Sequence, residues 1–497
     1  MAQVHPFRAF RYNPGRAAFD RVLTQPYDKI SPAMQEKYYA ADPHNLISIE
    51  KGRVFPNDSA QNNVYTRAAS ALQDWIHNSI VVQDPAPSFY GYTQEYTVPH
   101  TDERRTRRGF IGVGKVEDYS AGIVFRHEQT LSGPKADRLE LLRHTRVHTG
   151  QLFMLYSDAE RRVDAILAEA ESSSAPATEL RDEYGVVHRL WVIADAERVA
   201  AIQRAMAEQK LVIADGHHRY ETALNYRNER RSQAGGIDSS APYEFAMMTF
   251  INTRSEGLTI LPTHRVAANL HDFSWPSVRR HLEPWFTAEA FSFRNEGERS
   301  EARGKFLHRL TEMRAQRSIG AYPAAQSAKR AYYVLALRPG ADLAQLLPSV
   351  SPLQRELDVV LLHEGILEPA LGITPQAVTS EKNLRYEREA PAALEAVDTG
   401  AAQIAFLLNA CDVEQVMRIA TAGEVLPQKS TDFYPKLLSG ITMYRIEGGA
   451  RKRVVRPCPL PPVFVTAHSK GLSGAVSVSA ESKRLKGTSF DAKSRKL

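Results

Sequence analysis

The stretch LVIADGHHRYETALNYR, residues 211–227, decides the fold that we expect for this chain. The apolar run from Leu211 to Ala214 is typical of a buried strand, Asp215-Gly216 is a turn signal, and the following residues have helical spacing. The stretch therefore predicts a strand, a tight turn and a helix. Two histidines and an arginine then lie at the N-terminus of that helix.

The polar residues of this turn predict an anion site. A helix N-terminus exposes unpaired backbone N–H groups and the positive end of the helix dipole, and Gly216 lets a phosphate approach the backbone. Arg219 supplies bidentate hydrogen bonds, and His217 or His218 supplies another donor. Asp215 suits a helix cap, a Mg²⁺ ligand acting through water, or a base. A turn that only caps the helix is the structural alternative.

A second candidate group lies in VFRHEQTLSGPKADRLELLR, residues 124–143. Glu128 follows the end of an apolar strand, and a helix carrying Lys135, Asp137 and Arg138 begins soon after. A carboxylate beside a phosphate site is where phosphoryl transfer to an alcohol needs its proton acceptor. We therefore predict Glu128 as a catalytic base; a cap or a surface ion pair is the alternative.

Three further motifs predict substrate contacts or a clamp from a second domain. Their candidate residues are Asp28, His264, Arg265, Lys429, Ser430 and Thr431. Asp28 lies in a Pro-initiated turn, where it either stabilises the turn or binds a metal or a substrate amine. His264 and Arg265 follow a strand, and the alternatives for them are contact with an anion or a pair of surface residues. Lys429 and its neighbouring hydroxyls suit a phosphate or carboxylate.

The 497 residues are too many for one ordinary hydrophobic core, which indicates two or three domains. A content of 43% hydrophobic and 24% charged residues is typical of a globular protein. We expect a cytoplasmic protein, since the start resembles no targeting leader and no apolar run approaches the roughly 18 residues that cross a bilayer. The two cysteines, Cys411 and Cys458, are too few for a disulfide framework or a thiolate metal cluster. Adjacent histidines also differ from the i, i+4 pair of zinc proteases, so we expect no zinc site.

The basic charge of the chain is concentrated at its end. From Arg451 onward there are eleven Lys/Arg and two Asp/Glu of the chain's 63 and 57, so this segment carries about +9 and the rest about −3. Few large apolar residues occur there, which predicts a flexible extension. A nucleic-acid or membrane-surface tether is the alternative.

Alternating strand and helix patterns predict a mixed α/β (α+β) protein. Short strands are expected at Phe7 to Tyr12 and Leu46 to Glu50, and a surface loop near 320–330. From Asn269 the pattern is helix-rich, with YYVLAL and AQIAFLLNA as buried strands. We predict four regions: an N-terminal α/β region at 1–108, a core at 109–266, a C-terminal α/β domain at 267–447, and a basic tail at 448–497.

Six motifs along the chain resemble, in order and spacing, the domain of unknown function family 1015. They are HPFRAFRYNP, QPYDKIS, HEQTLSGPKADRLELL, IADGHHRYETAL, GLTILPTHRV and LPQKSTDFYPKLLSG. The resemblance runs from about residue 4 to residue 447. Within it, His-Glu followed by Asp-Gly-His-His-Arg is similar to the core of the ParB/sulfiredoxin-like fold, whose members include free-serine kinases.

This resemblance implies a kinase that phosphorylates free L-serine with ATP or ADP, with Mg²⁺ bridging the phosphates. It also implies that Gly216 to Arg219 hold the nucleotide phosphates and that Glu128 is the base on the serine hydroxyl. One departure is that Asp215 follows Glu128 by 87 residues. An inserted strand and helix are expected between them.

Two other functions use the same residues. A ParB-like nucleotide switch would engage DNA, through the basic tail, although the acidic body and the lack of a recognition-helix motif disfavour it. A phosphohydrolase or nuclease would use the same anion site with water as the nucleophile. The partners that we expect are a nucleotide and a small substrate, with no membrane.

Overall fold

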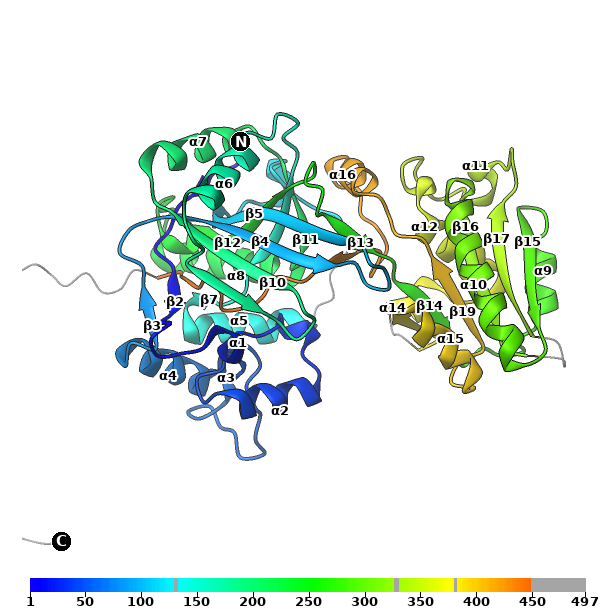
Figure 1. Ribbon diagram of the computed structural model, residues 1–497, viewed down its shortest axis with the longest axis horizontal. Helices are drawn as coiled ribbons and strands as arrows, with labels where there is room; N and C mark the ends of the chain where they lie inside the picture. Colours follow the sequence, from blue (N-terminus) through cyan, green and yellow to red (C-terminus); the bar gives the residue numbers. More distant parts are fainter. Residues whose placement is uncertain (129–132, 326–329, 380–381, 448–497) are drawn as a thin grey trace, which may run out of the picture. The chain divides into compact units, whose positions relative to one another are not determined.

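The computed structural model describes residues 1–128, 133–325, 330–379 and 382–447, so the predicted tail at 448–497 lies outside the described residues (Figure 1). The mixed α/β class is confirmed, because helices flank two large sheets. None of the described helices combines the length and the apolar character needed to span a bilayer.

The first sheet has nine strands in the order β6-β11-β8-β12-β5-β4-β10-β9, with β1 beside β5. They are β1 (Val4–His5), β4 (Phe89–Thr97), β5 (Arg104–Lys115), β6 (Val124–Arg126), β8 (Leu152–Tyr156), β9 (Thr178–Arg181), β10 (Val187–Ile193), β11 (Leu211–Asp215) and β12 (Phe245–Asn252). The β6/β11 and β8/β12 pairs are parallel and the others antiparallel. Such mixed pairing needs crossover helices between the parallel strands.

Helices lie on both faces of this sheet, and a segment from later in the chain covers part of one face. The helices of this half are α1 (Phe19–Val22), α2 (Pro32–Ala41), α3 (Ile47–Glu50), α4 (Val64–His77), α5 (Gly133–Thr145), α6 (Arg162–Ser173), α7 (Ala196–Ala207) and α8 (His217–Ala234), with the 3₁₀ turns η1 (Tyr27–Lys29), η2 (Tyr119–Ala121) and η3 (Pro242–Glu244). Apolar residues of α6, α7 and α8 share one buried cluster with the strands.

The second sheet has six antiparallel strands in the order β15-β17-β16-β19-β14-β18. They are β14 (His264–Ala267), β15 (Phe286–Phe293), β16 (Ser318–Pro323), β17 (Arg330–Leu337), β18 (Leu384–Glu387) and β19 (Ile404–Leu408). The two predicted strands, YYVLAL and AQIAFLLNA, are confirmed as β17 and β19. The predicted loop near 320–330 begins later, because β16 continues to Pro323; residues 326–329 lie outside the described residues.

Helices lie on both faces of the second sheet. They are α9 (Trp275–Leu282), α10 (Glu296–Glu312), α11 (Leu343–Leu346), α12 (Asp358–Leu362), α13 (Glu368–Leu371), α14 (Pro375–Thr379), α15 (Ala390–Asp398) and α16 (Val413–Thr421), with the 3₁₀ turns η4 (Met313–Gln316) and η5 (Gln354–Glu356) and the π-helical turn η6 (His363–Leu367). Apolar residues of α10 and α15 pack in one cluster with the strands. This half therefore combines the expected helices with a complete sheet.

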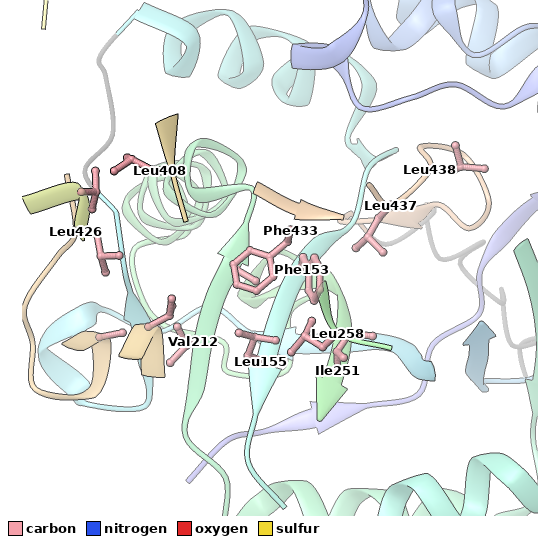
Figure 2. Packing of buried hydrophobic residues seen from close by; sticks show 14 of the residues in the cluster. Phe153, Leu155, Val212, Ile251, Leu258, Leu408, Leu426, Phe433, Leu437 and Leu438 are labelled. Carbon is pink, nitrogen blue, oxygen red and sulfur yellow. The ribbon is translucent and has the colours of Figure 1, made fainter. Parts of the chain in front are cut away.

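The segment 426–447 returns to the first sheet after the second sheet is complete. Within the described residues, three small two-stranded sheets occur, two of which involve this segment: β2 (Phe10–Tyr12) with β3 (Val81–Gln83), β7 (Val147–His148) with β21 (Tyr444–Arg445), and β13 (Thr259–Leu261) with β20 (Asp432–Tyr434). Phe433 packs edge-on against Phe153 of β8, with ring centroids 5.4 Å apart (Figure 2). Leu437 and Leu438 continue this buried layer, so apolar packing holds the segment on the sheet.

The predicted strand at Leu46 to Glu50 is wrong, because these residues form the short helix α3. Asn45 Oδ1 accepts the backbone N–H of Ile47 at 2.9 Å, which favours a turn at this point. Ile47, Ile49 and Glu50 are all buried, so the short run lacks the alternation of a strand. The predicted strand at Phe7 to Tyr12 forms only over Phe10–Tyr12.

The division into four regions stays a prediction. Strand β5 runs across the expected limit at 108/109, and β14 runs across the limit at 266/267. Residues 426–447 pair with β7 and β13, which precede the expected C-terminal domain. The described residues up to Glu447 therefore form one compact unit.

Candidate functional site

Two neighbouring parallel strands bring the predicted carboxylates to one edge of the first sheet. Val124 of β6 lies opposite Leu211 of β11, and both strands run in the same direction. Glu128 follows the end of β6, and Asp215 ends β11. Among the described residues, three helices and four strands separate them, more than the single strand and helix that we expected. The long insertion leaves the strand pair intact.

The strand, turn and helix predicted at residues 211–227 are confirmed. Gly216 precedes α8 with a φ of 92°, a left-handed conformation that favours glycine. A Cβ atom on Gly216 would lie 3.1 Å from both Nε and Nη2 of Arg219. Arg219 Nη1 also donates to the carbonyl of Gln151. Gly216 therefore provides both the turn and the space for a fixed guanidinium at the helix N-terminus.

Asp215 lies among positive charges. Its Oδ2 is 3.6 Å from Nζ of Lys436 and 3.9 Å from Nη2 of Arg219. Burial alone would raise the pKa of Asp215, but Lys436 and Arg219, with smaller contributions from His217 and the Gly216 amide, lower it to about 2. A carboxylate with so low a pKa is a weak base at neutral pH. The environment of Asp215 therefore favours a role as a fixed negative charge that binds cations.

Glu128 has the opposite electrostatic environment. Its side chain is 15% exposed, and the backbone N–H of Lys429 donates to its Oε1. Burial raises the pKa of Glu128 to about 7, although the Lys429 N–H and ammonium oppose this. A carboxylate with a pKa near the working pH is well suited to general-base chemistry.

Two histidines neighbour these carboxylates in the sequence, His127 beside Glu128 and His217 two residues after Asp215. His127 is fully buried, and burial lowers its pKa to about 4, so the ring is neutral. Its Nδ1 lies 2.6 Å from the Ile213 carbonyl, which can only accept, so Nδ1 carries the proton. Nε2 therefore accepts from Thr431 Oγ1 at 2.8 Å. His127 thus ties β6, β11 and the returning segment together.

The ring of His217 packs edge-on against His127, with centroids 4.7 Å apart. Burial and His127 lower its pKa far below the usual value. Within the described part of the chain, the buried Nε2 atom of His217 has no hydrogen-bond partner. His218 follows on α8, where its carbonyl accepts from Thr222 Oγ1 at 2.8 Å. An unpaired buried nitrogen beside Gly216 is suited to a ligand oxygen.

Of the predicted clamp residues at 429–431, Lys429 reaches Glu128, whereas Ser430 and Thr431 have other partners. Lys429 contacts Glu128 through its backbone, and has a φ of 58°. The hydroxyl of Ser430 donates to the carbonyl of Pro427 and is buried. Thr431 donates to His127. The hydroxyls of Ser430 and Thr431 therefore form hydrogen bonds within the protein. Of these three side chains, the Lys429 ammonium is the one that offers a charge to a ligand.

Arg265 and His264 are buried, which excludes the surface pair that we considered. Arg265 donates to the carbonyls of Thr263 at 2.6 Å and Gln428 at 3.2 Å, and to Nε2 of His363 at 3.2 Å. It therefore joins the second sheet to the loop that carries Lys429.

His264 has a structural environment in the second sheet. Its Nδ1 accepts the backbone N–H of Leu408 at 3.2 Å. Burial and the neighbouring Arg265 lower the pKa of His264 to about 4, so the ring is neutral at physiological pH. Its contacts favour packing over binding of an anion.

Asp28 is exposed and lies in the 3₁₀ turn η1. Its negative charge contributes to the raised pKa of Lys436, so the QPYDKIS motif lies near the Asp215 group. The adjacent Lys29 Nζ is 3.7 Å from Oδ1 of Asp432.

Sequence reasoning did not select Lys436 and Asp432 as site residues. Lys436 Nζ is 2.9 Å from Asp432 Oδ1 as well as 3.6 Å from Asp215 Oδ2. Burial opposes ionisation of Lys436, but these two carboxylates raise its pKa. Asp432 is also 2.9 Å from Nε of Arg388. The only signal in the sequence was the polar composition of PQKSTDFYPK.

Arg107 was also missed. It is 1% exposed, and it donates to Gln94 Oε1 and to the carbonyls of Tyr434, at 3.1 Å, and Pro435. Gln94 Nε2 in turn donates to the carbonyl of Lys436 at 2.8 Å. This pair fixes the backbone at residues 434–436 and so positions the Lys436 side chain. The sequence RRTRRGF predicts a charged strand, and its pattern gives no sign that Arg107 is fully buried.

A Mg²⁺ site remains a prediction. Among the described residues, no group of three or more His, Cys, Asp or Glu side chains is arranged to hold a metal ion. Mg²⁺ commonly binds one or two carboxylates together with waters and substrate phosphates. The single carboxylate of Asp215 fits an ion that is held mainly by nucleotide phosphates.

The fold and site define a mixed α/β protein with a glycine turn at a helix N-terminus beside a carboxylate of raised pKa. Residues 4–360 match the family described as Protein of unknown function (DUF1015), and the chain belongs to this family. Among curated proteins, no sequence matches it.

Similar solved structures are distant. A conserved hypothetical protein from Pyrococcus furiosus is 13% identical with a TM-score of 0.28, covering 63% of this chain and 87% of that chain. A free serine kinase in complex with AMP is 12% identical with a TM-score of 0.31, covering 65% and 88%. A free serine kinase variant in complex with ADP is 12% identical with a TM-score of 0.29, covering 65% and 89%.

Proposed function

We propose that this protein is a small-molecule kinase that transfers a phosphoryl group from ATP or ADP to the hydroxyl of free L-serine. The observation that carries the proposal is that Glu128 and the Asp215–Arg219 turn follow adjacent parallel strands. A base with a pKa of about 7 therefore shares one sheet edge with an anion site. Phosphoryl transfer to an alcohol needs both groups together.

The nucleotide phosphates bind at the start of α8. The backbone N–H groups after Gly216 and the positive end of the helix dipole face the anion. Arg219 and Lys436 add positive charge, since both lie within 4 Å of Asp215. The unpaired Nε2 of His217 supplies a further contact. When Mg²⁺ is bound, it neutralises charge on the phosphate oxygens, and Asp215 is the residue that would hold it.

Glu128 acts on the acceptor. Its carboxylate takes the proton of the serine hydroxyl as that oxygen bonds to the terminal phosphorus, and the bond from phosphorus to the bridging oxygen of the nucleotide breaks. The Lys429 N–H on Oε1 orients the carboxylate during this transfer. Asp215 is a poor alternative base because its pKa is about 2.

A free amino acid suits the charges around the site. Asp28 is exposed and offers a carboxylate to an ammonium group, while the ammonium of Lys429 offers a partner to a carboxylate. The motif resemblance implies L-serine as the acceptor. These residues are the first to test for substrate specificity.

The decisive experiment follows phosphoserine by phosphorus NMR with purified protein, Mg²⁺, L-serine, and ATP or ADP. We expect serine-dependent phosphoserine with the wild type, formation at least about 100-fold slower with Glu128→Gln, and normal amounts with Glu256→Gln, which alters a side chain that is 91% exposed. Nucleotide consumption without a serine requirement would replace the proposal with a phosphohydrolase. Tight nucleotide binding without consumption would favour a nucleotide switch.

A further inference from the structure

A cavity lies beside the second sheet, away from the residues that the proposed reaction uses. Its volume is about 580 Å³, and residues of α9, β15 and β17 form most of its walls. Figure 1 shows where these three elements lie in the fold. Neither Glu128 nor any residue of the Asp215–Arg219 turn lines it. Ligand pockets in proteins commonly measure about 300–1,000 Å³, so this cavity has the size of a small-molecule site.

The floor of the cavity is apolar and aromatic. Phe286 of β15, Tyr333 and Leu335 of β17, and Leu282 of α9 line it. The Trp275 ring packs against Tyr333, with centroids 5.0 Å apart. Rigid aromatic and aliphatic walls of this kind bind the apolar part of a small molecule.

Four arginines and one carboxylate also line the cavity. The arginines are Arg279 and Arg280 of α9, together with Arg330 and Arg338. Glu283 is the carboxylate, and its backbone carbonyl accepts from Arg338 Nε at 2.8 Å. The guanidinium of Arg279 lies over the Tyr333 ring, 5.6 Å from its centroid.

These arginines have few acidic partners. Nη1 of Arg330 lies 3.7 Å from Oδ1 of Asp398. For Arg279, Arg280 and Arg338, no carboxylate of the described residues lies within ion-pair distance. On α10, by contrast, Arg309 pairs with Glu289 at 2.9 Å. Like charges gathered around one cavity repel each other, and a bound anion removes that repulsion.

We propose that this cavity binds an aromatic organic anion, a carboxylate or phosphate whose ring lies on the apolar floor and whose charge contacts the arginines. Arginine suits both parts of such a ligand, because it forms bidentate bonds to carboxylate or phosphate and stacks on rings. This site is separate from the kinase site, and the proposal does not depend on the kinase activity.

The test titrates the full chain with 1-anilinonaphthalene-8-sulfonate, a fluorescent aromatic anion. We expect one saturable site in the wild type, and at least a tenfold higher Kd in the double variant Arg279→Glu, Arg280→Glu. The matched control is Arg16→Glu, Arg204→Glu, which makes the same change of charge at two exposed arginines. Its Kd stays within twofold of the wild-type value.

A second variant keeps the test valid if the charge reversal impairs folding. Ala288→Trp changes an exposed residue of the cavity wall to one that fills the cavity, and it abolishes the saturable binding. Indole and inorganic phosphate, each carrying one half of the ligand chemistry, bind at least tenfold more weakly than the fluorescent anion. Equal affinity in the wild type and both cavity variants, or no saturable binding at all, overturns the proposal.

Discussion

The backbone N–H of Lys429 donates a hydrogen bond to Oε1 of Glu128, although 301 residues separate them. Leu426 also forms a parallel bridge with Glu128, and its N–H donates to the His127 carbonyl at 2.7 Å. The carboxylate that follows β6 is therefore fixed by a loop from the end of the second sheet. Burial raises the pKa of Glu128, although Lys429 of this loop acts in the opposite direction.

The pH dependence of activity tests the proposed base. Glu128 accepts a proton only when ionised, so kcat/KM for phosphorylation rises with pH and reaches half of its maximum near pH 7, where its pKa lies. Glu128→Gln lowers kcat about 10²- to 10⁴-fold, as expected for loss of a general base. Steady-state kinetics from pH 5 to 9 measure both effects. A wild-type profile that is flat through pH 7 contradicts the assignment.

The same shift predicts a stability effect. The pKa of Glu128 is about 7 in the folded protein, against an ordinary value of 4.5. Between these values only the folded state binds the proton, so stability relative to Glu128→Gln falls as pH rises from 4.5 to 7. This pH-dependent loss of stability is absent below pH 4.5 and reaches about 3 kcal/mol above pH 7. Urea unfolding at several pH values measures it; a constant difference would exclude the shift.

Lys436→Gln tests the charge that the structure adds to the anion site. We expect the Kd for ATP and ADP to rise about 10- to 100-fold, because one charge-assisted contact is worth about 1.5–3 kcal/mol. Isothermal titration measures it, with Lys305→Gln as a control, since Lys305 forms an exposed pair with Glu301. The pKa of Asp215, followed by NMR, should also rise. Unchanged affinity would remove Lys436 from the site.

Gly216→Ala tests whether the turn holds Arg219. A left-handed alanine costs about 1–2 kcal/mol, and its Cβ would also crowd the Arg219 guanidinium. Gly235→Ala is the matched control, since Gly235 has a φ of 69° and open space around its Cβ position. We expect both variants to lose stability, but only Gly216→Ala to weaken nucleotide binding. Equal nucleotide affinity in the two variants would separate Arg219 from binding.

Arg107→Met tests the buried arginine. The substitution leaves Gln94 Oε1 and the carbonyls of Tyr434 and Pro435 without their donor. We expect a loss of about 3 kcal/mol in the free energy of unfolding and weaker nucleotide binding through displacement of Lys436. Urea unfolding measures the first effect, and Arg16→Met at an exposed site stays within about 0.5 kcal/mol of wild type. A loss below that limit in Arg107→Met would show that its contacts are dispensable.

Local patterns predicted the central part of the site. The apolar run before Asp215, the Asp-Gly turn and the helical spacing after it depend only on neighbouring residues, and the structure agrees with each. The short run at Leu46 to Glu50 forms a helical turn that its pattern does not predict, because five residues are too few to separate a strand from such a turn, and Asn45 Oδ1 accepts the Ile47 N–H at its start.

The sequence by itself determined the chemistry available to this protein: a glycine turn at a helix N-terminus, with an arginine one turn along, and a carboxylate after an apolar strand. The tertiary structure alone decided which charges meet. Parallel pairing of β6 with β11 joined Glu128 to the turn, and packing of the returning segment brought Lys436 to Asp215. Because burial and neighbouring charges set a pKa, only this packing gives one carboxylate a pKa near 7 and the other a pKa near 2.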